Sequence, residues 1–274
     1  MYYKLKKLLT LGVALSLSTA LVACASTADT TIKSNVLNVG ASPSPHAEIL
    51  QVIKPILAEK GIELIIKEFS DYVLPNRALD EGSLDANFFQ HQPYLDDFNK
   101  NNNTKIIAAA PVHFEPLGIY AGKSSDLNNI QKGAKIAVPN DTSNEARALQ
   151  LLEHNGILKL DPKAGLSATV KDIIENPYEV KIVEIEAAQV PRTLEDVDFA
   201  VINGNYALLA KVTDKILLTE SSDSNGAIEF ANILAIRQGD ENRPEIQALV
   251  EALTSETVRT FIIEQYGVSV VPVF

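Results

Sequence analysis

Strand and helix signals alternate along almost the whole chain from residue 36 to the carboxyl terminus. Short runs rich in Ile, Val and Phe predict strands, and apolar residues spaced three and four apart predict helices between them. This alternation indicates an α/β fold with largely parallel sheets. We expect strands over 36–40, 62–69, 86–89, 135–139, 180–185, 199–202 and 231–236, and helices over 46–60, 72–81, 144–155, 172–175, 206–211, 244–253 and 255–266.

The first 23 residues predict a secretory signal peptide that is not part of the fold. Three lysines precede an apolar run of about fifteen residues, whereas a relaxed membrane span needs about 20. Cys24 follows Leu-Val-Ala at 21–23, which resembles a bacterial lipobox. We therefore expect diacylation of Cys24, cleavage before it, and a flexible tether over 24–35. An uncleaved anchor helix with an incidental cysteine is the alternative.

The net charge and the cysteine count exclude several classes of protein. Cys24 is the only cysteine, so no internal disulfide can form. The formal net charge is −11, and removal of residues 1–23 takes away three lysines and no acidic residue, which makes it −14. A chain this acidic is a poor binder of nucleic acid. It is also not attracted to an anionic membrane, so membrane attachment depends on the lipid at Cys24.

The segment 87–94, Asn-Phe-Phe-Gln-His-Gln-Pro-Tyr, combines aromatic rings with amide and imidazole groups. It has more polar groups than we expect in a core strand and more aromatic area than we expect in an exposed loop. A partly closed pocket needs both. Tyr72, Phe89 and Tyr94 can surround an apolar side chain, with His91 at its edge. Ordinary core packing of these rings is the alternative.

Four predicted loops with polar or aromatic residues follow strands, at 41–46, 90–94, 140–147 and 203–206. Ligands of open α/β sheets bind where such loops converge, so we expect these loops and Asn232 to face one cleft.

Arg147 and two asparagines are the candidates for holding a polar head group. The planar fork of Arg147 suits a carboxylate, although a surface pair with Glu145 or Asp141 is the alternative. Asn203 and Asn205 can both donate and accept, as an amino-acid head group requires. Capping of the following helix is the other role open to them.

The sequence does not predict a metal site, a cofactor or an enzyme. His46, His91, His113 and His154 are widely spaced and have no cysteine partner, whereas zinc takes about four ligands. The chain has no Gly-x-Ser-x-Gly, no His-Glu-x-x-His and no glycine-rich phosphate loop. Its acidic residues are scattered as on a solvated surface.

Several motifs together resemble the NLPA family, the methionine-binding lipoproteins that serve as substrate-binding components of methionine ABC importers. The resemblance covers essentially the whole mature chain and keeps the motifs in order. It rests on Leu-Val-Ala-Cys at 21–24, Tyr-Val-Leu-Pro-Asn at 72–76, Asp-Ala-Asn-Phe-Phe-Gln-His-Gln-Pro-Tyr-Leu at 85–95, Val-Pro-Asn-Asp-Thr-Ser-Asn-Glu-Ala-Arg-Ala-Leu at 138–149 and Ala-Val-Ile-Asn-Gly-Asn-Tyr-Ala at 200–207.

The resemblance implies a two-lobed periplasmic-binding-protein-like fold of type II, with a ligand cleft between the lobes. Residues 36–115 and 230–274 would form lobe 1, and residues 116–229 lobe 2. The implied aromatic and histidine positions around the thioether are Tyr72, Phe89, His91 and Tyr94. Arg147 would hold the ligand carboxylate, and Asn203 and Asn232 its head group. Asn205 stands where many relatives have another small polar residue. The loop at 42–46 and Glu145 depart from the family pattern.

The function that the resemblance implies is capture of a ligand outside a bacterial cell membrane by a lipid-anchored protein that faces the periplasm or the exterior. The ligand would be L-methionine, with D-methionine as a second candidate, and the partners an importer permease and its ATPase. Another amino acid or a methionine-containing peptide is an alternative ligand. A surface adhesin or interaction lipoprotein is the alternative from another class.

Overall fold

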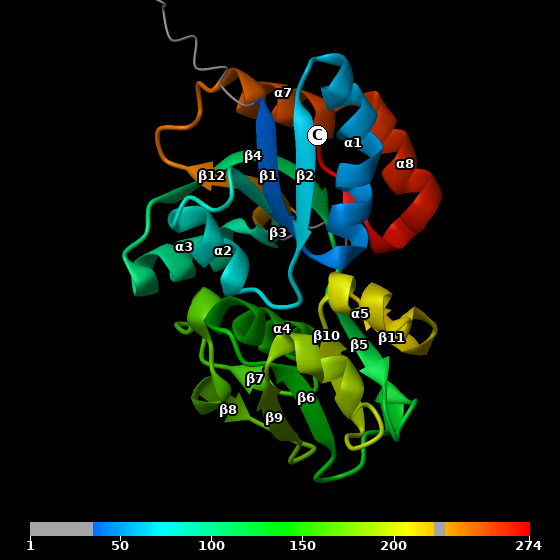
Figure 1. Ribbon diagram of the computed structural model, residues 1–274. Helices are drawn as coiled ribbons and strands as arrows, with labels where there is room; N and C mark the ends of the chain where they lie inside the picture. Colours follow the sequence, from blue (N-terminus) through cyan, green and yellow to red (C-terminus); the bar gives the residue numbers. More distant parts are fainter. Residues whose placement is uncertain (1–34, 222–227) are drawn as a thin grey trace, which may run out of the picture. The chain divides into compact units, whose positions relative to one another are not determined.

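The computed structural model describes residues 35–221 and 228–274, which carry two separate larger β-sheets (Figure 1). The predicted signal peptide at 1–23, Cys24 and the tether up to residue 34 lie outside the described residues. Within the part of the chain that is described, no helix is long and apolar enough to cross a membrane.

The first sheet has six strands in the order β13-β4-β12-β3-β1-β2. β1 pairs in parallel with β2 and β3, and β12 pairs antiparallel with β3 and β4. The strands are β1 (Val36–Ala41), β2 (Glu63–Glu68), β3 (Ala86–His91), β4 (Ile106–Phe114), β12 (Ala231–Arg237) and β13 (Val271–Pro272). The helices of this lobe are α1 (Glu48–Glu59), α2 (Leu74–Asp80), α3 (Gln92–Asn102), α7 (Pro244–Leu253) and α8 (Glu256–Tyr266).

The central strands of this sheet are buried on both faces. Phe88 and Leu234 belong to the core cluster that includes α1, α7 and α8, which lie side by side in Figure 1. Their neighbours Phe89 and Ile233 belong to a second cluster with α2 and α3. Because successive side chains of a strand point to opposite faces, helices cover both sides of β3 and β12.

The expectation that a core strand would not bury so many polar groups is wrong for β3. All six of its residues are buried, and it continues through His91, where we had predicted a loop over 90–94. Asn76 of α2 makes this possible. Its amide exchanges hydrogen bonds with the Gln90 amide at 2.7 and 2.8 Å, and Asn87 donates to Asn76 at 2.8 Å. Buried amides that bond to one another avoid the cost of unpaired burial.

The second sheet has five strands in the order β11-β5-β10-β6-β9. β6 pairs in parallel with β9 and β10, and β5 pairs antiparallel with β10 and β11. The strands are β5 (Gly118–Ala121), β6 (Lys135–Pro139), β9 (Lys181–Ile185), β10 (Phe199–Ile202) and β11 (Ile216–Thr219). The core with α4 (Thr142–His154) includes Leu149 and Val201, and the core with α5 (Gly204–Ala210) includes Ala200 and Ala207.

The remaining elements are short. β7 (Lys159–Leu160) pairs with β8 (Ile173–Glu175), so the predicted helix over 172–175 is wrong. The three residues of β8 close a small hairpin beside α4 instead. The other short helical segments are η1 (Pro43–Ala47), η2 (Leu127–Asn129), η3 (Gly165–Ser167), η4 (Val170–Asp172), η5 (Ala187–Thr193), η6 (Thr213–Lys215) and η7 (Gly267–Ser269).

The predicted α/β class and two-lobed arrangement are confirmed, but the sheets are mixed and not largely parallel. We call the first sheet with its helices lobe 1 and the second with its helices lobe 2. The chain leaves lobe 1 after β4, builds lobe 2 from β5 to β11, and returns as β12. The returning strand runs antiparallel to both of its neighbours. The residue boundaries predicted for the two lobes stay predictions.

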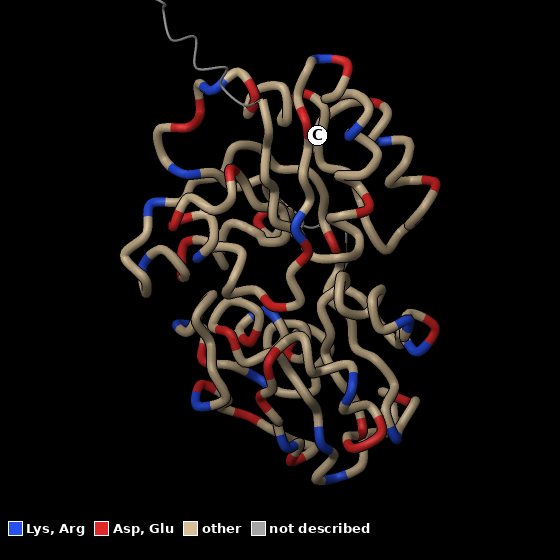
Figure 2. The backbone as a smooth tube through the Cα atoms, viewed as in Figure 1, with Lys and Arg blue, Asp and Glu red and all other residues tan. Residues whose placement is uncertain are grey.

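Charged residues do not favour one lobe. Figure 2 shows Lys and Arg interspersed with Asp and Glu along both lobes.

Candidate functional site

A pocket between the two lobes contains all eight residues predicted to bind a ligand. The predicted residues that line it are Tyr72, Phe89, His91, Tyr94, Arg147, Asn203, Asn205 and Asn232. Four further residues, which the sequence did not single out, complete the lining: Gln90, Glu115, Asn144 and Gly204. The pocket brings together the carboxyl ends of β3 and β10 and the amino ends of α3, α4 and α5.

Three aromatic rings form one wall of the pocket. The ring centre of Tyr72 lies 5.7 Å from those of Phe89 and Tyr94, and the Tyr94 hydroxyl donates to the carbonyl of Tyr72 at 2.9 Å. Burial raises the pKa of the Tyr72 and Tyr94 hydroxyls, which therefore stay neutral. The same rings pack into the core of lobe 1 around α2 and α3. Core packing and pocket lining thus coexist, and the wall suits an apolar ligand side chain.

His91 links the start of α3 to lobe 2. Its Nδ1 accepts the backbone N–H of Tyr94 at 3.2 Å, and its Nε2 donates to Oδ1 of Asn144 at 3.2 Å. Burial and, to a smaller extent, the positive charge of Arg147 lower the pKa of His91 to about 3. The two hydrogen bonds fit one neutral tautomer, because a protonated Nδ1 would face the Tyr94 donor.

Arg147 is buried in α4, with only 4% of its area exposed. Its Nε and Nη2 donate to the carboxylate of Glu220 at 2.9 and 2.5 Å, and Nη2 also donates to the carbonyl of Glu115 at 2.9 Å. The Phe230 ring centre lies 4.4 Å from its Cζ, a cation–π contact.

The alternative of a surface arginine paired with Glu145 or Asp141 is wrong. Glu145 accepts the backbone N–H of Val170, and Asp141 caps α4.

The three asparagines have separate partners. Asn203 donates to Oδ1 of Asn144 at 2.8 Å, Asn205 accepts the Tyr72 hydroxyl at 2.6 Å, and Asn232 Oδ1 lies 3.0 Å from Nε2 of His46. The side chain of Asn203 does not cap α5, so the capping alternative is wrong for this residue. Its Oδ1 is buried and has no hydrogen-bond partner among the described residues. The bonds Tyr72–Asn205 and His91–Asn144 join the two lobes across the pocket.

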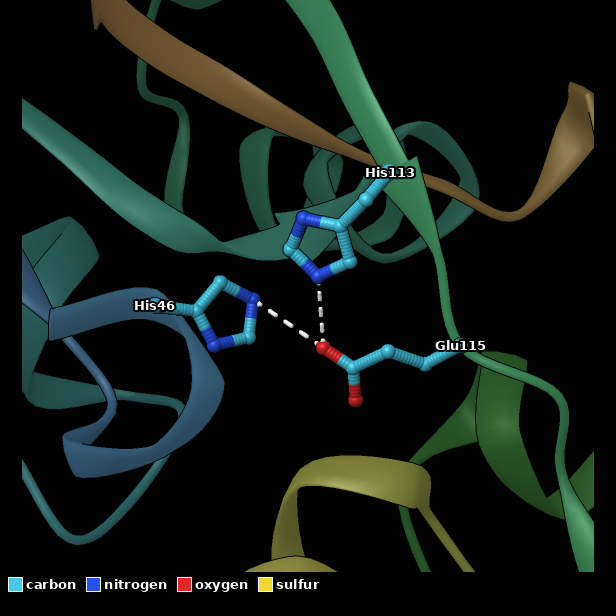
Figure 3. Close-up of side chains that lie close together, drawn as sticks. All are labelled: His46, His113 and Glu115. Atoms are coloured by element: carbon cyan, nitrogen blue, oxygen red, sulfur yellow. Dashed lines mark hydrogen bonds and ion pairs between the residues drawn. The ribbon is translucent and has the colours of Figure 1, made fainter. Parts of the chain in front are cut away.

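Glu115 is the main residue that sequence reasoning missed. It lies in the segment between β4 and β5, and Figure 3 shows its carboxylate facing two histidines. Oε1 is 2.7 Å from Nε2 of His113 and 3.4 Å from Nε2 of His46. Burial raises the pKa of Glu115 and lowers the pKa of His46 to about 4 and that of His113 to about 3. No local motif predicts this cluster, because His46 lies far from His113 and Glu115 in the sequence.

Among the residues that the structure describes, His46, His113 and Glu115 are the group best placed to hold a metal ion. Their ligand atoms lie within 4.8 Å of one another. Both Nε2 atoms face oxygen acceptors, however, and within the described ranges neither Nδ1 has a partner. This pattern favours protons on both Nε2 atoms, which leaves no lone pair there for a cation. The absence of a metal site stays a prediction.

Two lobes around a pocket lined by a buried arginine, amides and aromatic rings define the fold of a substrate-binding protein of ABC transporters. The chain belongs to the NlpA lipoprotein family, whose sequence profile matches residues 37–274.

Named relatives are similar in sequence to this chain over nearly their whole length. The methionine-binding lipoprotein MetQ of Bacillus subtilis is 36% identical, with 98% of this chain and 99% of the relative covered. Among solved structures, a nutrient-binding protein from Burkholderia cenocepacia bound to methionine is 45% identical, with a TM-score of 0.82 over 87% of this chain and 100% of that one. A periplasmic substrate-binding protein of an ABC transporter from Coxiella burnetii is 41% identical, with a TM-score of 0.81 over 86% and 100%.

The family membership confirms two predictions, namely that the protein is not an enzyme and that it is a lipoprotein. The family consists of substrate-binding proteins of ABC transporters, which are not enzymes. Its relatives MetQ of Bacillus subtilis and of Escherichia coli are named as lipoproteins. The assignment of individual side chains to a ligand stays a prediction.

Proposed function

We propose that this protein captures methionine in the pocket between its lobes and delivers it to the permease and ATPase of an ABC importer. The observation that carries the proposal is the pairing, within one pocket, of the buried guanidinium of Arg147 with the ring wall of Tyr72, Phe89 and Tyr94.

The two ends of methionine match the two sides of this pocket. Contacts between a thioether and aromatic rings contribute about 0.3–1.5 kcal/mol each, so the ring wall takes the side chain. A buried carboxylate needs a charged partner, and Arg147 supplies it. Relatives named as methionine-binding and a related structure bound to methionine support this choice of ligand. L-methionine is the expected form, and D-methionine is the second candidate because relatives are also named for it.

Closure of the lobes links binding to transport. Tyr72–Asn205 and His91–Asn144 are hydrogen bonds between the lobes. A ligand that touches Arg147 on one lobe and the rings on the other binds the closed form better, and so raises its population. The permease then distinguishes loaded from empty protein by its shape.

The membrane anchor is the diacylated Cys24, with the folded part facing the periplasm or the exterior. Two acyl chains give stable anchoring, at about 0.8 kcal/mol for each buried CH₂. Replacement Cys24→Ser should move the protein from the membrane fraction to the soluble fraction of cells without changing methionine binding. A Cys24→Ser protein that stays in the membrane fraction would overturn the lipid anchor.

The test of the ligand is mass spectrometry of small molecules released by denaturing the purified protein. Methionine is the expected cargo. Another amino acid or a methionine-containing peptide would keep the transport role and change the ligand. Protein refolded without ligand should then bind L-methionine in a calorimetric titration, with leucine as a control of similar size. A flat titration with methionine, leucine and a methionine dipeptide would favour the adhesin alternative.

A further inference from the structure

The pocket has one acidic side chain among its described lining residues, and it is Glu115. We infer that Glu115 is the counter-charge for the ligand ammonium, so that the pocket recognises a free α-amino acid by both of its charges. This inference rests on the proposed function, because it assigns a second subsite to the same ligand.

Glu115 and Arg147 are adjacent. Nη2 of Arg147 donates to the backbone carbonyl of Glu115 at 2.9 Å, and both side chains line the pocket. The carboxylate and ammonium of an α-amino acid are attached to the same carbon, so they need a cation and an anion side by side. A buried ammonium without an opposite charge would carry a large desolvation cost. The described lining offers such a pair only at these two residues.

The Glu115 carboxylate has capacity for a ligand in addition to its protein partners. Oε1 accepts from Nε2 of His113, and the backbone N–H of Asn205 is a second donor to the carboxylate. A carboxylate has further acceptor positions, which these two bonds do not fill. His113 thus acts as a positioning residue that fixes the direction of the carboxylate.

Gly204 lets lobe 2 approach this carboxylate closely. A Cβ atom at position 204 would lie 2.9 Å from Cβ of Glu115 and 3.0 Å from its Oε2. Both distances are too short for an ordinary contact, so any larger residue would push Glu115 away from the pocket wall. The close approach places the carboxylate at the junction of the two lobes, where a bound ligand touches both.

Asn203 supplies a second acceptor for the same ammonium. It lines the pocket and is 7% exposed, and its Oδ1 is buried with no hydrogen-bond partner in the described part of the chain. A buried acceptor without a donor is costly in the empty protein. An ammonium has several N–H donors, so it can satisfy Asn203 and Glu115 together.

The rival explanation is that Glu115 only anchors the segment that joins the lobes. A ligand analogue separates the two roles, because 4-(methylthio)butanoic acid is methionine without its ammonium. The anchor role affects methionine and the analogue equally. The ammonium role affects methionine alone.

The experiment is calorimetric titration of wild type and Glu115→Gln with both compounds. Loss of one partner of a buried charge pair costs more than tenfold in affinity, so wild type should bind methionine at least roughly tenfold more tightly than the analogue. Glu115→Gln should lose roughly tenfold or more for methionine and less than about threefold for the analogue. The matched control is Glu145→Gln, a buried glutamate of α4 that does not line the pocket, which should leave both affinities unchanged.

The outcomes distinguish a failure of the Glu115 assignment from a failure of the proposed methionine-binding function. A wild-type protein that binds the analogue as tightly as methionine overturns the role of Glu115 while the methionine function stands, and this comparison needs no folded variant. Equal losses for both compounds in Glu115→Gln also overturn it. A wild-type protein that binds neither compound overturns the proposed function itself.

Discussion

Glu220 accepts hydrogen bonds from both Nε and Nη2 of Arg147, although Glu220 itself is not among the residues that line the pocket. The same carboxylate accepts the backbone N–H of Leu117 at 2.8 Å. The Glu220 side chain therefore holds the Arg147 guanidinium against Leu117, in the segment that joins the lobes. Within residues 35–221 and 228–274 the hydrogen bonds of Arg147 come from Nε and Nη2, and Nη1 is the donor that we assign to a ligand carboxylate.

Replacement Arg147→Ala should weaken methionine binding by more than tenfold, because the charge-assisted hydrogen bond from Nη1 to the ligand carboxylate is lost. Calorimetric titration measures the effect, and thermal unfolding checks that the fold remains intact. Arg192→Ala, which removes an exposed arginine of η5, is the control and should bind as wild type does. A folded Arg147→Ala protein with wild-type affinity would remove Arg147 from the site.

Replacement Glu220→Ala should lower the free energy of unfolding of the ligand-free protein by about 2 kcal/mol, because Arg147 then stays buried without its anion. The Glu220 side chain is 18% exposed, which keeps the value below that of a fully buried pair. The deficit should shrink in saturating methionine, since the ligand supplies a carboxylate. Urea unfolding with and without ligand measures both quantities.

The control for Glu220 is Glu251→Ala, which breaks the exposed pair between Lys60 and Glu251. Exposed pairs contribute about 0–1 kcal/mol, so this change should be small and independent of methionine. An equal effect of the two replacements would contradict the positioning role of Glu220.

Replacement Tyr72→Phe should weaken methionine binding roughly fivefold, since the closed form loses the 2.6 Å hydrogen bond to Asn205, worth about 1 kcal/mol. Tyr266→Phe is a matched control, because its hydroxyl makes a 2.6 Å bond to Glu48 within lobe 1. Titration of the two variants side by side measures the difference. Identical affinities would mean that the Tyr72 bond does not contribute to closure.

Replacement His91→Asn should remove a pH-dependent loss of stability. The pKa of His91 is lowered from 6.5 to about 3 by burial and by Arg147, so below pH 6.5 the unfolded chain binds a proton that the folded protein does not. Stability of the wild type should therefore fall relative to the variant by about 1.4 kcal/mol per pH unit between pH 6 and 4. Asn keeps an acceptor for the Tyr94 N–H at the start of α3.

Urea unfolding of both proteins at pH 7, 6, 5 and 4 measures the His91 effect. The difference between the two curves isolates this residue from other titrating groups, such as Glu115, whose raised pKa acts in the opposite direction. Parallel curves would show that His91 titrates normally in the folded protein.

The sequence predicted the elements of the fold well where apolar spacing alone determines them. The strand at 135–139 and the helix at 244–253 were predicted with the bounds that the structure has. The parallel character of the sheets was overestimated, because spacing along the chain does not reveal that β12 returns between β3 and β4. β3 was ended too early, since its polar residues depend on Asn76 for their partners.

The predicted site residues came together in one pocket because most of them lie near one end of a strand or near the start of a helix. Glu115 and Asn144 were missed for different reasons. Asn144 stood inside the quoted motif at 138–149 and was given no role, although it bonds both His91 and Asn203. Glu115 was counted with the scattered acidic residues that we interpreted as a solvated surface, although it stands in an apolar stretch, 106–121. Only the fold shows that it is 5% exposed and faces His46 and His113.

The position of β12 in the sheet sets the order in which the protein can be completed during synthesis. Lobe 2 is built from one continuous stretch, so all of its strands have been made once β11 has been made. Lobe 1 begins first but lacks an interior strand until β12 follows, because β3 and β4 are not neighbours without it. A chain truncated after β11 therefore contains every strand of lobe 2, whereas lobe 1 lacks the strand that joins β3 to β4.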